Sequence, residues 1–316
     1  MNFYSRWIAR KKPNYDFIRY RFFAFSLTGL LIIASVASMV VKGFNFGIDF
    51  AGGILVEVHS EAPAELGAMR INLEQLHLGE VSLQEFGSTG HDVMIRVQRQ
   101  PGDEKAQMAA LAKVKENLGS GYDYRRVEIV GPKVGDELKR DGTLAVALAV
   151  MAIAAYVWFR FEWQFGVGAL IAIFHDVITT FGLFSITGLE FNLTTVAAIL
   201  TIAGYSINDT VVEYDRVREN LRKYKTMSLY DLLNLSVNDT LARTILTVCT
   251  VFVSVMALLL LGGDVLYGFS VAMLWGLIVG TYSSVYVAMP VLIYFNLRTG
   301  KEAEEAEAAS QPEQMG

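Results

Sequence analysis

Six long runs of apolar residues limit what this chain can fold into. About 20 consecutive apolar residues suffice to cross a bilayer as a helix, which satisfies its backbone hydrogen bonds internally. Of the 316 residues, 53% are hydrophobic and only 19% are charged, and the mean hydropathy is +0.37. We therefore predict an α-helical polytopic membrane protein. The expected spans are 22–41, 143–159, 165–187, 192–212, 241–261 and 266–295.

The distribution of positive charge predicts how these spans are oriented. Lysine and arginine are enriched on the cytoplasmic side of membrane proteins. Segment 216–225 contains five of them, whereas the short loops 188–191 and 262–265 contain none. The flank before the first span carries Arg6, Arg10, Lys11, Lys12, Arg19 and Arg21. We expect an uncleaved first span, both termini in the cytoplasm, and residues 42–140 on the outer side of the membrane.

The external region has the pattern of a small folded domain. Short strands are expected at 54–58, 81–86, 93–97 and 122–130, and helices at 64–78 and 104–118. The order β-α-β-β-α-β predicts a ferredoxin-like α+β domain. The predicted organisation is an N-terminus with the first span, 1–41, an external domain, 42–140, five further spans, 141–298, and a disordered cytoplasmic tail, 299–316.

The sequence contains no pattern typical of a metal site or of a common enzyme active site. The single cysteine, Cys249, lies in an apolar run, and the four histidines show no metal-ligand spacing. We find no phosphate-binding loop, dinucleotide-binding fingerprint or hydrolase elbow. The net charge of −5 argues against a nucleic-acid partner. We expect no metal, no cofactor and no enzymatic activity.

One carboxylate, Asp209, lies well inside the fourth apolar run. Placing a charge there costs about 3 kcal/mol on insertion scales, so such residues usually face a protein interior or a wet cavity and carry a function. The functional interpretation is a residue that takes up and releases protons. The alternative is a static structural pair near the cytoplasmic edge.

The neighbours of Asp209 are unusually polar for a membrane span. Gly204 weakens the helix, and Tyr205, Ser206 and Asn208 can hold water or satisfy freed backbone groups. Because residues three and four apart share a face, one face is expected to carry Ile202, Tyr205, Ser206, Asp209 and Glu213.

Arg243 is the expected counter-charge of Asp209. It opens the predicted fifth span on the same cytoplasmic side. The alternative is an arginine that reaches the interface and pairs with Asp239, one turn earlier. The residues alone do not decide between these two possibilities.

Two further pairs in the spans could be functional or structural. His175 and Asp176 lie near the centre of the third span, where a proton relay and a hydrogen-bonded packing pair are both possible. Gly276 and Gly280 form a G-x-x-x-G pattern in the sixth span, which is typical of close helix packing.

Several segments resemble the SecF subunits of the SecD/SecF protein-export family. The resemblance covers nearly the whole chain and is most specific around Asp209. The segments are GIDFAGG (47–53), VGPKVGDEL (130–138), GYSINDTVVEYDRVREN (204–220), TLARTILT (240–247) and GGDVLYGFSVAMLWGLIVGTYSSVYVA (262–288).

The resemblance implies half of a transporter of the resistance–nodulation–division superfamily. With SecD it would use the proton-motive force for late, ATP-independent translocation of polypeptide, and the family's intramembrane aspartate and arginine fall on Asp209 and Arg243. The implied partners are SecD, the SecYEG translocon, possibly YajC and YidC, and unfolded exported polypeptide. The alternatives are half of a small-molecule exporter and a passive scaffold of the translocon.

Overall fold

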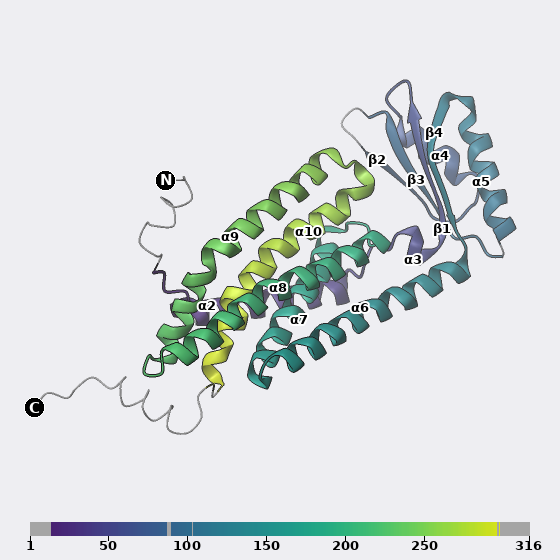
Figure 1. Ribbon diagram of the computed structural model, residues 1–316. Coiled ribbons are helices and arrows are strands. Elements are labelled where there is room, and N and C mark those ends of the chain that lie inside the picture. The colour runs from purple at the N-terminus through teal and green to yellow at the C-terminus, as the bar shows by residue number, and fades with distance from the viewer. Residues whose placement is uncertain (1–13, 87–89, 103, 296, 298–316) are drawn as a thin grey trace, which may run out of the picture.

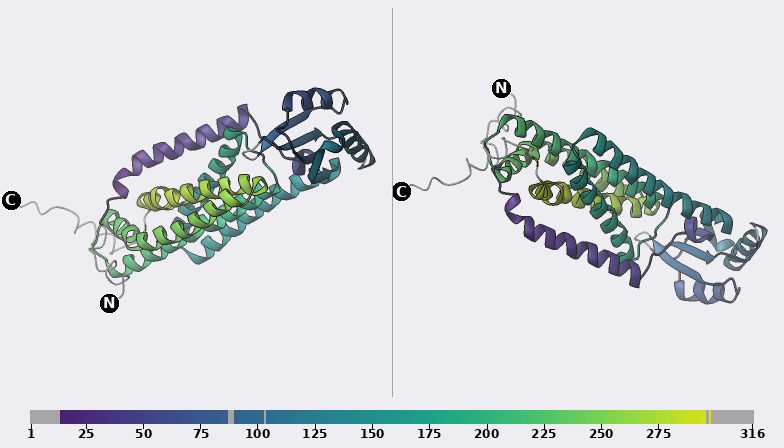
Figure 2. Two further views of the ribbon diagram at one scale, coloured as in Figure 1. Left: turned by 90° about the horizontal axis from the view of Figure 1, so that it is seen from above. Right: turned by 90° about the horizontal axis from the view of Figure 1, so that it is seen from below.

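The computed structural model describes residues 14–86, 90–102, 104–295 and 297. Long helices form a bundle, and a small sheet domain projects from one end of it (Figure 1). Views from above and below show the same arrangement, with α2 along one side of the bundle (Figure 2). This is the predicted fold class, a helical polytopic protein with a small α+β domain between its first two spans. The tail expected at 299–316 lies outside the described residues.

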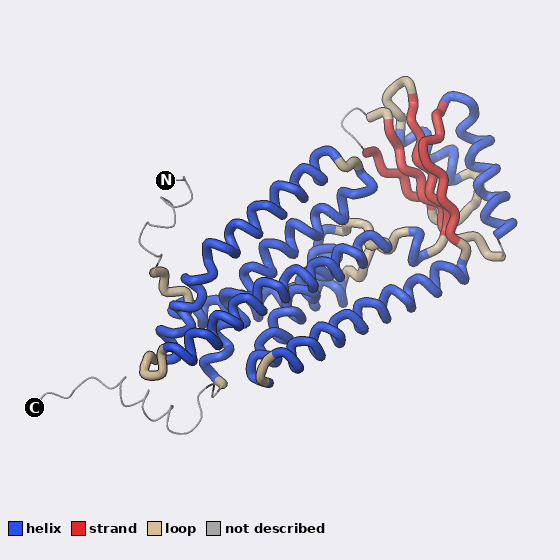
Figure 3. Tube along the Cα trace, in the orientation of Figure 1, coloured by secondary structure: helices blue, strands red, loops and turns tan. Residues whose placement is uncertain are grey.

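The sheet domain has four antiparallel strands in the order β2-β3-β1-β4 (Figure 3). The sequence of its elements confirms the predicted β-α-β-β-α-β pattern. Apolar residues of β1 and β3, such as Ile54, Val56 and Ile95, form a core that includes Leu73 and Val114 of the two helices. The elements are β1 (Gly53–Ser60), α4 (Leu66–Glu74), β2 (Val81–Phe86), β3 (Asp92–Gln98), α5 (Glu104–Leu118), a 3₁₀ turn (Gly119–Gly121) and β4 (Tyr122–Val130).

Six helices in the described part of the chain are long and apolar enough to cross a membrane, as predicted. They are α2 (Arg21–Val41, preceded by a 3₁₀ turn at Ile18–Tyr20), α6 (Pro132–Arg160), α7 (Trp163–Thr187), α8 (Leu193–Lys223), α9 (Leu229–Leu261) and α10 (Asp264–Ser283). After α10 the chain continues through a π-helical turn (Ser284–Ala288), α11 (Met289–Val291) and a 3₁₀ turn (Leu292–Tyr294).

Three of these helices are longer than the sequence analysis predicts. α6 starts before residue 143, α8 continues beyond residue 212, and α9 starts before residue 241. Hydropathy predicts only the part of a helix that can lie in hydrocarbon. The helix itself can continue through polar residues, because backbone hydrogen bonds persist until a capping residue ends them. The start of α8 has such a cap, because the side chain of Asn192 accepts a hydrogen bond from the backbone of Thr195 in a capping box.

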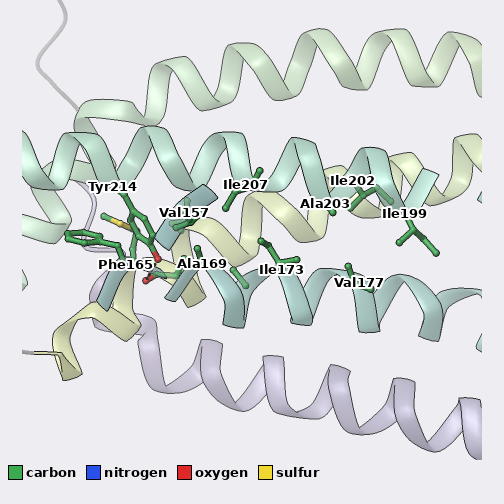
Figure 4. Close-up of a cluster of buried hydrophobic side chains, with 14 of the residues drawn as sticks. Val157, Phe165, Ala169, Ile173, Val177, Ile199, Ile202, Ala203, Ile207 and Tyr214 are labelled. Atoms are coloured by element: carbon green, nitrogen blue, oxygen red, sulfur yellow. Dashed lines mark hydrogen bonds between the residues drawn. The ribbon is translucent and has the colours of Figure 1, made fainter. Parts of the chain in front are cut away.

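The spans form an inner and an outer set. More than half of the membrane-spanning residues of α7, α8 and α10 are buried, but fewer than a fifth of those of α2, α6 and α9. Figure 4 shows the apolar core between the inner helices, with Ile173 and Val177 of α7 beside Ile199 and Ile202 of α8. The outer helices therefore expose apolar surface, as expected for contact with lipid or with another membrane protein.

Two glycines allow α10 to lie close against α8. A Cβ atom added at Gly276 would lie 2.3 Å from Ile202, and one at Gly280 would lie 3.1 Å from Ser206. The G-x-x-x-G pattern thus faces the helix that carries Asp209, which accords with its expected packing role.

The sheet domain is attached to the start of α8 by several contacts. The linker carries the short helix α3 (Ile48–Ala51). Before it, Gly47 donates a backbone hydrogen bond to Phe191 (2.9 Å), which in turn donates to Asn45 (2.8 Å). The Asp49 carboxylate accepts a hydrogen bond from the backbone of Leu193, the first residue of α8 (2.9 Å). These bonds fix the linker to the end of the helix.

An ion pair between Arg96 of β3 and Glu190 adds a direct link from the sheet to the α7–α8 loop. Both side chains are mostly buried, with 17% and 22% of their surfaces exposed. Burial raises the pKa of the Glu190 carboxyl, and the nearby carboxylates of Asp49 and Glu128 act in the same direction. The Arg96 and Arg126 guanidinium groups partly offset this shift. Glu190 should therefore become protonated at a higher pH than an exposed glutamate. Once protonated, it loses the charge that pairs with Arg96.

We predict that mild acid loosens the sheet domain and that Glu190→Gln does so at every pH. Spin labels at Ala62 and Val265, in a Cys249→Ser background, would report the distance between the sheet domain and the bundle. In the parent protein the distance distribution should broaden as the pH falls through the raised pKa of Glu190. Glu219→Gln, which removes a carboxylate paired with Arg216 on α8, is the matched control. An unchanged distribution in Glu190→Gln would refute the link.

Candidate functional site

Three polar side chains with buried oxygens lie along one face of α8. They are Tyr205, Asp209 and Glu213, spaced four residues apart, so they stack along the helix. One carboxylate oxygen each of Asp209 and Glu213 is buried without a hydrogen-bond partner among the described residues, whereas the Tyr205 hydroxyl lies near Thr247 of α9. We call these three residues the α8 stripe.

Burial of the polar groups of the α8 stripe lowers the stability of the fold, and packing alone does not compensate that cost. Asp209 is 5% exposed and Glu213 is 1% exposed. Each buried polar group without a partner costs about 1–3 kcal/mol, and more if it is charged. Such groups inside a membrane protein mark proton, ion or water pathways. A carboxyl group is chemically able to bind and release a proton, so the α8 stripe is the candidate functional site.

Arg243 lies on α9, the helix next to this stripe. Its guanidinium is close enough to act electrostatically on the Asp209 carboxylate, although no ion pair within 4.0 Å joins them in the region that the structure describes. The prediction that Arg243 opens its helix is wrong, because α9 begins at Leu229 and Arg243 lies well inside it. Asp239, its proposed alternative partner, forms an ion pair with Arg216 of α8 (3.6 Å).

His175 and Asp176 form a hydrogen-bonded network between α7, α8 and α10. Both are fully buried on α7, and His175 Nδ1 lies 2.9 Å from one Asp176 oxygen. The other oxygen accepts hydrogen bonds from Ser206 of α8 (2.5 Å) and Ser283 of α10 (2.8 Å). One carboxylate thus holds the three inner helices together. This geometry accounts for Asp176 as a packing residue, while the relay role of His175 stays a prediction.

The neighbours of Asp209 lie in different surroundings. Ser206 lies on the buried face, as expected from its spacing, and its hydroxyl is bonded to Asp176. Asn208 is exposed on the surface of the chain, away from the buried face. Gly204 does not unwind the helix, since α8 is continuous from Leu193 to Lys223. A glycine in a well-packed helix lowers its stability without necessarily breaking it.

The π-helical turn after α10 was not predicted from the sequence. Ser284 in this turn shares a hydrogen bond with Thr210 of α8 (2.8 Å), and the Tyr214 hydroxyl donates to the carbonyl of Ala288 (3.3 Å). Such turns occur often at functional sites. Pro290 is the sequence signal, because proline has no N–H to bond the carbonyl four residues earlier and disturbs the helix there.

Among the residues that the structure describes, no group of three or more His, Cys, Asp and Glu could hold a metal ion. The candidate site is the α8 stripe, whose Asp209 carboxyl lies within electrostatic range of the Arg243 guanidinium of α9.

Comparison with known proteins identifies the family. A family model described as the C-terminal part of protein export membrane protein SecD/SecF matches residues 110–298, and one described as the SecD/SecF GG motif matches residues 37–64. The chain belongs to the SecD/SecF family. The first match contains both Asp209 and Arg243.

Individual relatives place the chain among SecF translocase subunits. It is 44% identical to protein translocase subunit SecF of Rickettsia bellii over 297 residues, covering 93% of this chain and 98% of the relative. It is 43% identical to the same subunit of Cereibacter sphaeroides, covering 96% of each chain. These relatives make it a multi-pass bacterial membrane protein of the SecF type.

Solved structures agree with this assignment. The crystal structure of SecDF, a translocon-associated membrane protein from Thermus thermophilus, matches 90% of this chain at 35% identity with a TM-score of 0.80. A SecDF structure in a super-membrane-facing form matches 94% of the chain at 35% identity with a TM-score of 0.67. The chain spans about two fifths of these SecDF polypeptides, 39% and 40% respectively.

We predict that Ser206→Ala destabilises the chain by about 1.5–3 kcal/mol, because a hydrogen bond to a charged group is lost in a buried site. Ser270→Ala is the matched control, since Ser270 is fully buried in α10 and its hydroxyl has no partner among the described residues. That control should be neutral or stabilising. Unfolding of each purified variant in detergent measures the difference. Equal effects of the two variants would show that the Asp176 network does not hold the helices.

Proposed function

We propose that this chain, together with SecD, couples inward proton movement to late, ATP-independent steps of polypeptide export. The observation that carries the proposal is the α8 stripe, in which the buried Asp209 carboxyl lies within electrostatic range of Arg243 on α9. Membership of the SecD/SecF family supports protein export as the process.

In this proposal Asp209 is the residue that takes up and releases protons. When it is ionised, Arg243 stabilises its charge; when it is protonated, that attraction is lost and the two helices can separate or shift. Tyr205 and Glu213 extend the path along α8 in both directions. A proton that crosses 100 mV yields about 2.3 kcal/mol, which shifts a two-state equilibrium substantially.

α8 is well suited to transmit such a shift to the sheet domain. It is a single helix from Leu193 to Lys223, and Asp209 lies near its middle. Its first residue is bonded to Asp49, and the loop before it is paired with Arg96 of the sheet. A displacement of α8 at Asp209 therefore reaches the sheet domain through direct contacts. The sheet domain would act on the exported polypeptide.

The exposed side of α8 fits a partner membrane protein such as SecD. Ala197, Thr201, Gly204 and Asn208 are exposed and recur every three or four residues on a helix that is otherwise mostly buried. Small residues allow a neighbouring helix to approach closely. The chain spans only about two fifths of the matched SecDF polypeptides, which supports a need for SecD. SecYEG, with YajC and YidC as additional candidates, would be further partners.

Two rival functions make different predictions for the same residues. Half of a small-molecule exporter would also need Asp209, but its activity would not depend on exported polypeptide. A passive translocon scaffold would not need Asp209 at all. The unpartnered buried oxygens of the α8 stripe argue against the scaffold, because a structural role does not compensate their energetic cost.

The first test is Asp209→Asn, which keeps the size and polarity of the side chain but removes the titratable group. Stimulation of late translocation by a proton gradient should disappear in inverted membrane vesicles, while assembly with SecD should remain. Asp215→Asn is the control, because Asp215 lies on the same helix in an exposed pair with Arg160. Gradient dependence that persists in Asp209→Asn would refute proton coupling at this residue.

The second test concerns orientation, since the proposal needs the sheet domain outside the inner membrane. In a Cys249→Ser background, a cysteine replacing the exposed Ala62 should react with an impermeant maleimide in intact spheroplasts. A cysteine replacing the exposed Thr226, between α8 and α9, should react only after the membrane is opened. The reverse labelling pattern would contradict the proposed topology.

A further inference from the structure

A large apolar groove lies between α6, α7 and the linker that precedes the sheet domain. Its volume is about 520 Å³, within the range of small-molecule sites. Phenylalanines form its floor: the rings of Phe44 and Phe191 lie 5.3 Å apart, and those of Phe181 and Phe191 stack at 5.7 Å. The α8 stripe contributes no residue to this groove.

The groove offers almost no partner for a polar ligand. Apart from backbone atoms, the polar groups among its described lining residues are Lys139 and Thr143 of α6. The Thr143 hydroxyl already donates a hydrogen bond to the carbonyl of Lys139 (2.8 Å). A polypeptide in this groove would leave its backbone N–H and C=O groups without partners, at several kcal/mol for each group in an apolar medium. A hydrocarbon chain has no such groups.

The length of the groove fits one leaflet of a bilayer. It follows α6 from Lys139 to Met151, which is about 18 Å at 1.5 Å per residue. Half of the hydrocarbon thickness of a bilayer is about 15 Å. The groove also lies beside α6, one of the least buried spans, so it can be reached from the lipid.

A cation is placed at the end of the groove next to the sheet domain. The Lys139 ammonium lies 4.7 Å from the centre of the Phe46 ring, and its side chain is exposed. Lysine at the end of a span, with its charge at the membrane surface, is positioned to contact lipid headgroups. An anionic headgroup would complement it.

We propose that this groove binds one acyl chain of an anionic phospholipid, whose headgroup phosphate contacts Lys139. The site is distinct from the proton-coupling residues and does not depend on their role. The bound acyl chain would lie next to the linker that joins the sheet domain to α8. The lipid comes from the leaflet on the sheet-domain side.

Photo-crosslinking of lipids tests the proposal directly. The full chain, purified with SecD, is reconstituted into vesicles containing phosphatidylglycerol with a diazirine on its acyl chain. Parallel vesicles contain phosphatidylcholine with the same chain. Peptide mapping should locate the label on residues 143–151 and on the facing surface of α7. One lysine near the surface is worth about a fivefold preference for the anionic lipid.

Two pairs of variants separate the headgroup contact from the groove itself. Lys139→Glu should abolish the preference for phosphatidylglycerol, whereas Arg140→Glu, an equal change of charge at an exposed residue outside the groove lining, should keep it. Ala147→Phe should fill the groove and remove labelling by both lipids, whereas Leu148→Phe on the neighbouring exposed surface should not. Equal labelling by both lipids in the parent protein, or labelling unchanged by Ala147→Phe, overturns the proposal. A further comparison uses this chain reconstituted without SecD. Labelling of the chain alone but not of the complex also overturns the proposal, because SecD then covers the groove.

Discussion

Three carboxylates inside a helical membrane bundle constrain this structure more than any other feature. Each must be paired, hydrogen-bonded or protonated, because an isolated charge cannot be held in an apolar interior. Asp176 meets this requirement structurally, with bonds from His175, Ser206 and Ser283. Asp209 and Glu213 each keep a buried oxygen without a partner among the described residues. The contrast separates a carboxylate that holds helices together from two carboxylates for which we propose a change of protonation.

The two kinds of carboxylate act at neighbouring positions on one helix. Asp176 is bonded to Ser206 of α8 and to Ser283 of α10, whereas Asp209, three residues after Ser206, lies within electrostatic range of Arg243 on α9. The bonds of Asp176 therefore hold α8 in place directly beside Asp209. The same helix begins at the contacts of Asp49 and Glu190 with the sheet domain. In the proposed function, this arrangement would pass a change in the protonation of Asp209 to the sheet domain through one helix and the contacts at its end.

Much of the fold could be predicted from the sequence because the signals are local. Apolar runs placed the six spans, and alternation placed the strands; 81–86, 104–118 and 122–130 match the observed elements. Helix ends were predicted poorly, since the polar extensions of α6, α8 and α9 lack hydropathic signals. Helical spacing placed Tyr205, Ser206, Asp209 and Glu213 on one face. It could not reveal the bond of Ser206 to Asp176, 30 residues away, because that bond depends on how α7 packs. The Arg96–Glu190 pair joins residues 94 apart, so local patterns could not reveal it.

The central claim is that Asp209 changes its protonation when a proton gradient is imposed. Infrared difference spectroscopy of the reconstituted complex with SecD, with the aspartate carboxyl carbons of this chain isotope-labelled, measures this directly. Switching the pH on the sheet-domain side should produce a carboxyl band that is present in the parent protein and absent in Asp209→Asn. The band should shift when Arg243 is replaced by methionine, because the nearby cation is removed. Identical difference spectra for the parent protein and Asp209→Asn would contradict the account.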